Sequence, residues 1–131
     1  MSDSVMAWLR DFAACVRARD FDRGRILCSQ NILSFGTVAH ITVGLEQLVK
    51  QQWTSVWNVT RDFDFDYEHT HIDARDDLAW VAAPWASHGF AEDGSSYLRE
   101  GRATIVLRRE HDGWRAIHTH LSTRPRGHDS P

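Results

Sequence analysis

Three polar side chains alternate near the end of the sequence: His118, His120 and Ser122. If this segment is a β-strand, alternate residues point to one face, and Trp114 shares that face. Imidazole titrates near neutral pH, so a histidine in a pocket can act as acid, base or hydrogen-bond donor. We therefore predict His118 and His120 as catalytic residues and Ser122 as a ligand-binding residue. The alternative is that these histidines hydrogen-bond neighbouring strands, or that they lie on the outer face in a dimer interface.

Arg102 and Thr104 alternate in the same way along the preceding segment. A guanidinium in a half-apolar cavity offers a planar fork of donors to a carboxylate or enolate oxygen. We predict Arg102 as the anion anchor among the catalytic residues and Thr104 as a ligand-binding residue. The alternative for Arg102 is a structural ion pair with one of the 18 acidic side chains.

Tryptophan is unusually frequent, with six in 131 residues. Its large ring and its N–H group, which needs an acceptor, indicate an aromatic-lined pocket. The candidate wall residues are Phe35, Trp53, Trp57, Trp80 and Trp85. Trp80 and Trp85 have opposite parity along one predicted strand, so only one of them faces inward unless a bulge intervenes. The alternative is that these rings only build the core.

The sequence gives little indication of metal binding, carboxylate catalysis, nucleotide binding or hydrolase activity. Two His-x-His pairs, at positions 69/71 and 118/120, lack a third metal ligand at a suitable spacing, so we predict no metal and no cofactor. Asp64, Asp66 and Glu68 alternate strictly, as on a solvated strand face, and receive no catalytic role. The sequence contains no nucleotide-binding, serine-hydrolase or zincin motif.

The hydrophobic pattern predicts the elements that position these residues. Apolar steps of three and four predict helices over residues 4–19, 21–27 and 44–56. Alternation predicts strands over residues 31–35, 59–68, 78–90, 97–109 and 114–123. Strands this long require a strongly coiled sheet with bulges. The predicted fold class is α+β, with N-terminal helices packed on a strongly curved antiparallel sheet, an α+β barrel or cone with a pocket at its open end.

Length, charge and hydropathy predict the number of domains, the classes of partner and the location of the protein. The sequence predicts one domain over residues 1–123 and a flexible C-terminal tail over 124–131, which lacks apolar residues. A net charge of -3 without a basic stripe argues against nucleic acid as a partner. The sequence has neither a signal-peptide pattern nor a long apolar run, so we expect a cytoplasmic protein without membrane contact. Cys15 and Cys28 are predicted to be buried thiols.

Three segments carry a resemblance to a known family. GRATIVLRREHDGWRAIHTHLS looks like the C-terminal hairpin of the SnoaL-like family, within the nuclear transport factor two-like (NTF2-like, cystatin-like) superfamily. GLEQLVKQQW resembles the third helix of that family and DDLAWVAAPW one of its strands, so the resemblance covers about residues 5–123. The HxHxS ending is also similar to that of the calmodulin-dependent protein kinase association domain.

The resemblance implies a cone-shaped fold, and it places an arginine at Arg102 in a GRxT pattern. Family members include polyketide cyclases, ketosteroid isomerase, dehydratases and noncatalytic dimerisation or ligand-sensing modules, among which fold alone cannot choose. We predict binding of a small apolar or carboxylate-bearing molecule. A catalytic form would be a cofactor-free isomerase, cyclase or hydrolyase that transfers a proton next to a carbonyl. The alternative is a noncatalytic association module that homodimerises through the open sheet face.

Overall fold

The structure is a computed structural model that describes residues 2–111 and 113–124. Two helices come first, α1 (Ser2–Ala18) and α2 (Phe21–Ile26), and a helix of mixed geometry follows over residues 45–59. The strands are β1 (Cys28–Phe35), β2 (Thr42–Val43), β3 (Arg61–Phe65), β4 (His71–Arg75), β5 (Leu78–Phe90), β6 (Ser96–Glu110) and β7 (Gly113–Thr123). Residues 125–131 of the predicted tail lie outside the described residues.

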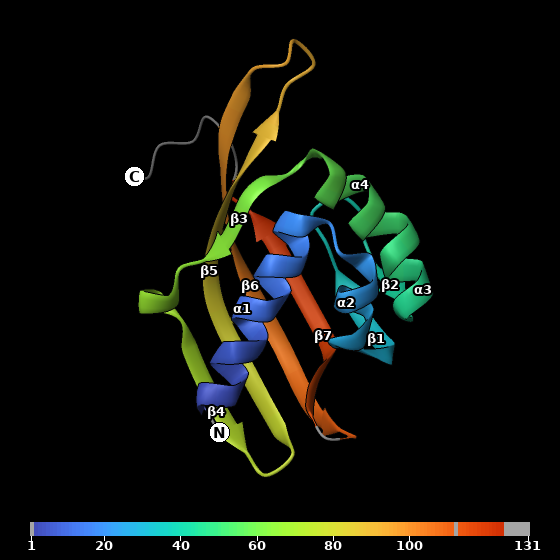
Figure 1. Ribbon diagram of the computed structural model, residues 1–131, viewed down its shortest axis with the longest axis vertical. Helices are drawn as coiled ribbons and strands as arrows, with labels where there is room; N and C mark the ends of the chain where they lie inside the picture. Colours follow the sequence, from blue (N-terminus) through green and yellow to red (C-terminus); the bar gives the residue numbers. More distant parts are fainter. Residues whose placement is uncertain (1, 112, 125–131) are drawn as a thin grey trace.

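All seven strands belong to one curved sheet in the order β2-β1-β7-β6-β5-β3, with β4 also paired to β5. Figure 1 shows the helices on one face of this sheet, which we call the inner face; the opposite face is the outer face. The predicted α+β class with helices on a curved sheet is confirmed. The sheet is mixed rather than antiparallel, because β1 runs parallel to β7. The sheet is an open one, since its order ends on β2 and β3.

The predicted third helix is present, but its geometry changes along its length. It begins as α3 (Leu45–Leu48), continues as the π-helical turn η1 (Val49–Trp53) and α4 (Thr54–Val56), and ends as the 3-10 turn η2 (Trp57–Val59). Within the π turn Gln52 and Trp53 are both buried. Such turns are rare, and they occur frequently at functional sites.

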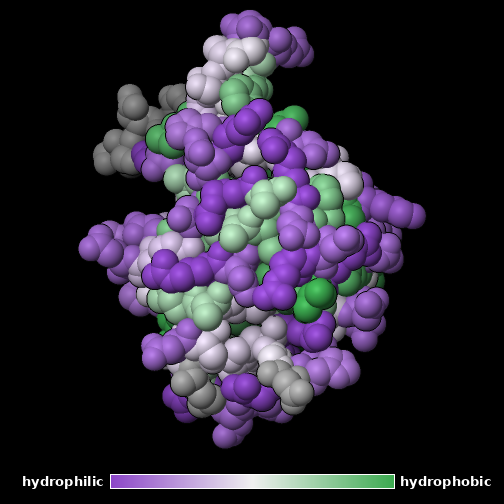
Figure 2. Space-filling model, viewed as in Figure 1, coloured by the Kyte–Doolittle hydropathy of each residue, from purple (hydrophilic) through white to green (hydrophobic). Residues whose placement is uncertain are grey.

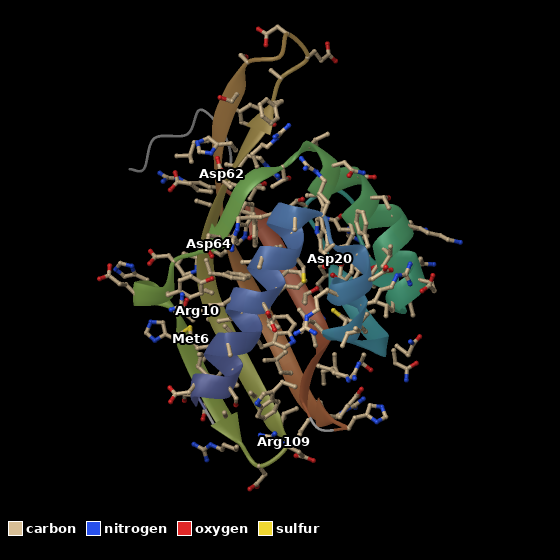
Figure 3. The ribbon with its side chains drawn as sticks, viewed as in Figure 1. Met6, Arg10, Asp20, Asp62, Asp64 and Arg109 are labelled. Atoms are coloured by element: carbon tan, nitrogen blue, oxygen red, sulfur yellow. The ribbon has the colours of Figure 1, made fainter. Side chains whose placement is uncertain are left out.

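The single strand predicted over residues 59–68 is wrong. β3 ends at Phe65, the 3-10 turn η3 (Tyr67–His69) follows, and β4 begins at His71. Tyr67 leaves the strand to lie under the Arg10 guanidinium, 4.1 Å from its ring centroid, and its hydroxyl donates to Asp64 at 2.5 Å. Figure 3 shows Arg10 on α1 and Asp64 near the end of β3. A local polar contact therefore overrides the alternating pattern.

The core lies between the helices and the inner face. Its fully buried side chains include Val5 and Leu9 from α1, Ile32 from β1, Val81 from β5, and Ile105 and Leu107 from β6. Cys15 and Cys28 are buried free thiols, as predicted. The side seen in Figure 2 is mostly hydrophilic, since the helices turn their polar faces outward there. No helix among the described residues combines the length and apolarity needed to cross a bilayer.

Candidate functional site

A cavity of about 50 Å³ lies between α1, the helix over residues 45–59 and the inner face of the sheet. Its lining residues come from α1 (Phe12, Val16), β1 and the loop after it (Ser34, Phe35, Gly36, Thr37), the helix (Leu48, Gln52, Trp53, Val56, Trp57), Thr60 and β3 (Phe63), and the later strands (Trp85, Arg99, Thr119, Leu121). Residues from both ends of the sequence therefore share one cavity.

Aromatic rings make most of the walls. Trp53 and Trp57 stack at a centroid distance of 4.4 Å, because they are one helical turn apart. Phe12 from α1 meets both rings edge-on at 6.1 and 5.9 Å, and Phe63 lies 5.5 Å from Trp85 on the sheet side. Such a lining favours an apolar or aromatic ligand body.

Trp85 can cross the neighbouring strand because its partner is a glycine. Trp85 pairs with Gly101 across β5 and β6. A methyl group on Gly101 would lie 2.4 Å from the Trp85 ring and 2.0 Å from the Ser122 carbonyl oxygen. The absence of a side chain at position 101 thus sets the position of one cavity wall.

Arg99 on β6 is the only ionised side chain among the described residues that line the cavity. Its two Nη atoms donate to the hydroxyls of Thr60 and Thr37, each at 3.4 Å, and its guanidinium lies 5.6 Å from the Trp85 ring centroid. No carboxylate of the described residues forms an ion pair with it. Burial lowers the pKa of Arg99 because desolvation penalises its charged form. A half-buried cation without an anionic partner is thus present at the cavity.

The other polar groups of the lining are neutral. Ser34 and Thr119 hydrogen-bond to each other at 2.6 Å across β1 and β7 and so satisfy each other. The indole Nε1 of Trp85 is buried and has no acceptor. The described lining contains no Asp, Glu, His, Lys, Cys or Tyr side chain. It therefore offers hydrogen-bond donors, but no group that exchanges a proton near neutral pH.

Four of the predicted ligand-binding residues border this cavity: Phe35, Trp53, Trp57 and Trp85. The parity argument for Trp80 and Trp85 is confirmed, since Trp85 is buried and Trp80 is exposed on the outer face. Phe35 has the outer parity, because its neighbour Ser34 faces inward against Thr119. Its ring therefore packs edge-on against His118 and His120 on the outer face, at 5.4 and 5.3 Å, although the residue borders the cavity.

The polar candidates of the last two strands come together, but on the outer face. Arg102 pairs with Ser122 and Thr104 with His120 across β6 and β7, and none of the four lines the cavity. His118 is held by a hydrogen bond from its Nδ1 to the Leu33 carbonyl oxygen (2.8 Å). The catalytic and ligand-binding roles assigned to these residues stay predictions.

A β-bulge explains why His118 and His120 do not share a face with Trp114, as the alternation predicts. Leu107 pairs with Ala116 and Val106 with His118, so Ile117 is an extra residue on β7. An extra residue reverses the parity of everything beyond it. Trp114 and Ala116 are buried on the inner face, whereas Thr119 replaces His118 and His120 in the cavity lining.

Arg99 was missed by the sequence prediction, although the sequence carries a signal for it. Ala103, Ile105 and Leu107 form the buried parity of β6, and extending that parity backwards reaches Gly101 and Arg99. Arg102 has the opposite parity. The alternation of residues 103–107 therefore predicts that Arg99 faces inward. The prediction chose Arg102 instead because of the family-like GRxT pattern.

One group of potential metal ligands occurs in the described part of the chain, formed by Glu68 and His69 of the turn η3 and by Asp66 just before it. All three residues are exposed, and His69 Nδ1 already lies 2.8 Å from Asp66 Oδ2. None of the three residues lines the cavity.

Solved structures of similar fold are numerous. An NTF2-like superfamily protein from Salmonella enterica serovar Typhimurium superposes with a TM-score of 0.79 at 16% identity, covering 96% of this chain and 92% of that one. The association domain of CaMKII from C. elegans gives 0.72 at 15% identity, with 93% and 95% coverage. A ketosteroid isomerase-like protein from Erwinia carotovora atroseptica gives 0.75 at 15% identity, with 92% and 94% coverage.

At these identities the structural likeness establishes the NTF2-like, cystatin-like cone fold alone. No curated protein matches the sequence at a significant level. The model of the SnoaL-like domain family matches residues 5–125, almost the whole chain. Fold and sequence agree, and the chain belongs to the SnoaL-like domain family.

Proposed function

We propose that this protein binds a small organic anion, a carboxylate attached to an apolar or aromatic body, in the cavity under its helices. The single observation that carries the proposal is Arg99, a half-buried guanidinium that donates to two hydroxyls, lies near the Trp85 ring and forms no ion pair with a carboxylate of the described residues. Desolvation makes such a charge costly unless an anion compensates it. A carboxylate at this place would receive short charge-assisted hydrogen bonds instead of two long neutral ones.

The cavity walls support the same ligand class. Trp53, Trp57, Phe12 and Phe63 surround the space with ring faces and edges, which suit an apolar body. Together with Arg99, these walls suit a ligand that brings an anionic acceptor and an apolar surface.

The proposal is for binding rather than proton transfer. Isomerases, cyclases and hydrolyases that act next to a carbonyl need a general base within hydrogen-bond reach of the substrate. The described cavity lining supplies none, because its only ionisable side chain is an arginine, which stays protonated. A ligand-sensing or carrier role therefore fits the cavity better than catalysis does.

The test is a titration with pairs of isosteric ligands, followed by tryptophan fluorescence because three tryptophans line the cavity. Benzoate and cyclohexanecarboxylate are compared with benzamide and cyclohexanecarboxamide at pH 7 and constant ionic strength. We expect saturable quenching by the carboxylates, with affinity at least ~10-fold above that of the amides, because charge-assisted bonds are roughly twice as strong as neutral ones. Equal affinity for acid and amide, or no saturation by either, would contradict the proposal.

The outer face favours a second function, self-association. One row of paired residues crosses five strands there: Val43 (β2), Leu33 (β1), His118 (β7), Val106 (β6) and Trp80 (β5). Four of these five are apolar, and Val43 and Trp80 are 65% and 46% exposed. A row of this kind indicates an interaction surface.

We propose a second copy of this chain as the occupant of the outer face, paired about a two-fold axis. A sheet face with apolar residues along one row is complementary to itself in such a pair. The likeness in fold to the association domain of CaMKII supports this choice of partner. Small-molecule binding on the inner face and dimerisation on the outer face are compatible, since they use opposite sides of the same strands.

Light scattering after size exclusion tests the dimer. Wild type should have the mass of two chains, and Val43→Asp should shift it towards one chain because a carboxylate would be buried in the interface. Val59→Asp is the matched control, since Val59 is similarly exposed (56%) but lies on the turn η2. A monomeric wild type, or an equal effect of both substitutions, would contradict the proposal.

A further inference from the structure

The cavity is too small for the ligand class proposed above. It measures about 50 Å³, enough for a few water molecules, whereas ligand pockets start at about 300 Å³. A ring-bearing carboxylate can enter only if part of the wall moves. The inference below concerns which part moves and what holds it; for its ligand it rests on the proposed function.

The most weakly attached wall is the loop over residues 36–41 between β1 and β2, which we call the strap. Gly36 and Thr37 from the strap border the cavity, while Val38 and Ile41 expose their side chains to solvent. The only internal backbone hydrogen bond found in the strap runs from Gly36 N to the Ala39 carbonyl oxygen (3.1 Å). The other walls belong to helices and paired strands, whose movement would break many more bonds.

Hydrogen bonds tie the strap to the domain through two side chains. Gln52 from the π turn is the main one: its Oε1 accepts from the backbone N–H of Ala39 (2.7 Å) and of Val38 (3.3 Å). Its Nε2 donates to the Thr37 hydroxyl at 3.3 Å. The carboxamide lies directly against Gly36, where a methyl group would come within 2.4 Å of it. Gln52 is itself buried, with 8% exposure, so its side chain is held in place by the residues packed around it.

Arg99 is the second attachment. Its Nη2 donates to the Thr37 hydroxyl at 3.4 Å, the long end of the hydrogen-bond range. A ligand carboxylate would displace the Thr37 hydroxyl from the same Nη2, because an ionised acceptor makes the shorter and stronger hydrogen bond. Ligand binding at Arg99 therefore loosens one of the two attachments of the strap, while Gln52 keeps the other.

We propose that the strap is a gate to the cavity, that Gln52 is the latch that keeps it closed in the free protein, and that the anion exchanges with Thr37 at Arg99 as it enters. The closed strap keeps the cavity small and leaves the Thr37 hydroxyl bound to the guanidinium. An open strap gives the carboxylate access to Arg99 and the apolar body access to the aromatic walls. Gln52 acts through the strap and is thus a positioning residue.

Backbone amide hydrogen exchange of the ligand-free protein tests the latch. In wild type the N–H groups of Val38 and Ala39 should be protected, although they belong to an exposed loop. Gln52→Leu removes the acceptor at similar volume and should speed exchange of both amides by at least tenfold, with β6 and β7 unchanged. Unprotected Val38 and Ala39 in wild type, or the same exchange in wild type and variant, would overturn the latch.

Gln47→Leu is the matched control. Gln47 lies earlier in the same helix, and its Oε1 also accepts from a backbone amide, that of Val43 (2.8 Å), outside the strap. This substitution should leave Val38 and Ala39 protected. If Gln52→Leu does not fold, Thr37→Val serves instead, because it removes the hydroxyl bound by both Gln52 and Arg99 from an exposed loop; it should speed exchange of the two amides several-fold.

Stopped-flow fluorescence with benzoate tests the gate. A closed latch slows entry, so Gln52→Leu should raise the association rate constant several-fold, and Gln47→Leu should not change it. An unchanged rate constant in Gln52→Leu would overturn the gate while leaving the proposed binding intact. Absence of benzoate binding in every protein would overturn both the proposed function and the gate's occupant, whereas the exchange experiment judges the latch on its own.

Discussion

The two faces of β6 differ more than their sequences suggest. Arg99 and Arg102 are three residues apart, yet Arg99 lies half-buried among aromatic rings and Arg102 lies exposed beside Ser122. The inner face combines a full core with a cavity at which Arg99 forms no ion pair with any described carboxylate, whereas the outer face has a mostly apolar row that includes His118, with His120 and hydroxyls beside it. The comparison teaches that position relative to the helices, rather than residue type, decides which arginine can anchor a ligand.

The largest expected effect concerns the packing of the two faces. Ile105 is fully buried on the inner face, and Thr104 beside it is exposed on the outer face. Ile105→Ala should lower the free energy of unfolding by about 2–5 kcal/mol because it leaves a cavity in the core. Thr104→Ala should cost less than about 1 kcal/mol. Urea unfolding at one protein concentration measures both; similar losses would mean that the two faces are equally packed.

A smaller loss of stability is expected at Gly101, the strand partner of Trp85. Gly101→Ala should cost about 1–3 kcal/mol, because the new methyl group overlaps the Trp85 ring and the Ser122 carbonyl oxygen. Gly113→Ala is the control, since nothing lies within 4 Å of a methyl group there. It should change the free energy of unfolding by less than about 0.5 kcal/mol. The tryptophan emission of Gly101→Ala should also shift; two variants of equal stability would show that Trp85 does not depend on this glycine.

The smallest effect concerns an ion pair near the end of β6, where Arg108 donates to Glu110 through Nε at 2.9 Å and through Nη2. The hydrogen bonds from Arg108 hold the pKa of Glu110 below its ordinary value. A carboxyl with a lowered folded-state pKa stabilises the fold above its unfolded pKa of about 4.3, and this stabilisation is lost as pH falls through the folded value. Both side chains are partly exposed, so the loss is below about 1 kcal/mol.

Unfolding curves between pH 7 and pH 3 measure this term. Wild type should lose more stability than Glu110→Gln over that range, and the two proteins should converge at the acid end. Asp22→Asn on α2 is the control, since Asp22 forms no ion pair with any described residue. A Glu110→Gln variant with the same acid dependence as wild type would contradict the role of the pair.

The sequence predicted the fold well because periodicity records which side of each element is buried. The helices over residues 4–19 and 44–56 and the long strands β5, β6 and β7 were found within a few residues. Strands β2 and β4 were not predicted, and the strand predicted over residues 59–68 was too long. Nothing local predicts that β1 joins β7 in parallel, that Tyr67 leaves the predicted strand for Arg10, or that a π turn interrupts the third helix. Each depends on contacts between residues far apart in the sequence or on a shift of hydrogen-bond register.

The site was predicted in part, for a similar reason. Trp53, Trp57 and Trp85 were predicted correctly as cavity residues. Periodicity alone identifies large apolar residues at inward positions. The polar candidates depended on counting parity along β7, and a single bulge at Ile117 reversed that count. Arg99 follows correctly from the unbroken parity of residues 101–107 of β6. Alternation along a strand predicts which face a residue occupies only when no bulge lies between that residue and a buried residue of known face.

The central claim is that Arg99, and not Arg102, anchors a carboxylate. Benzoate affinity is measured by calorimetry for wild type, Arg99→Met and Arg102→Met, since methionine keeps an apolar stem and removes the charge in both cases. Losing charge-assisted hydrogen bonds worth about 1.5–3 kcal/mol predicts an affinity about 10- to 150-fold lower for Arg99→Met. Arg102→Met should bind as wild type does. Equal affinity in Arg99→Met and wild type, or a loss confined to Arg102→Met, would contradict the account.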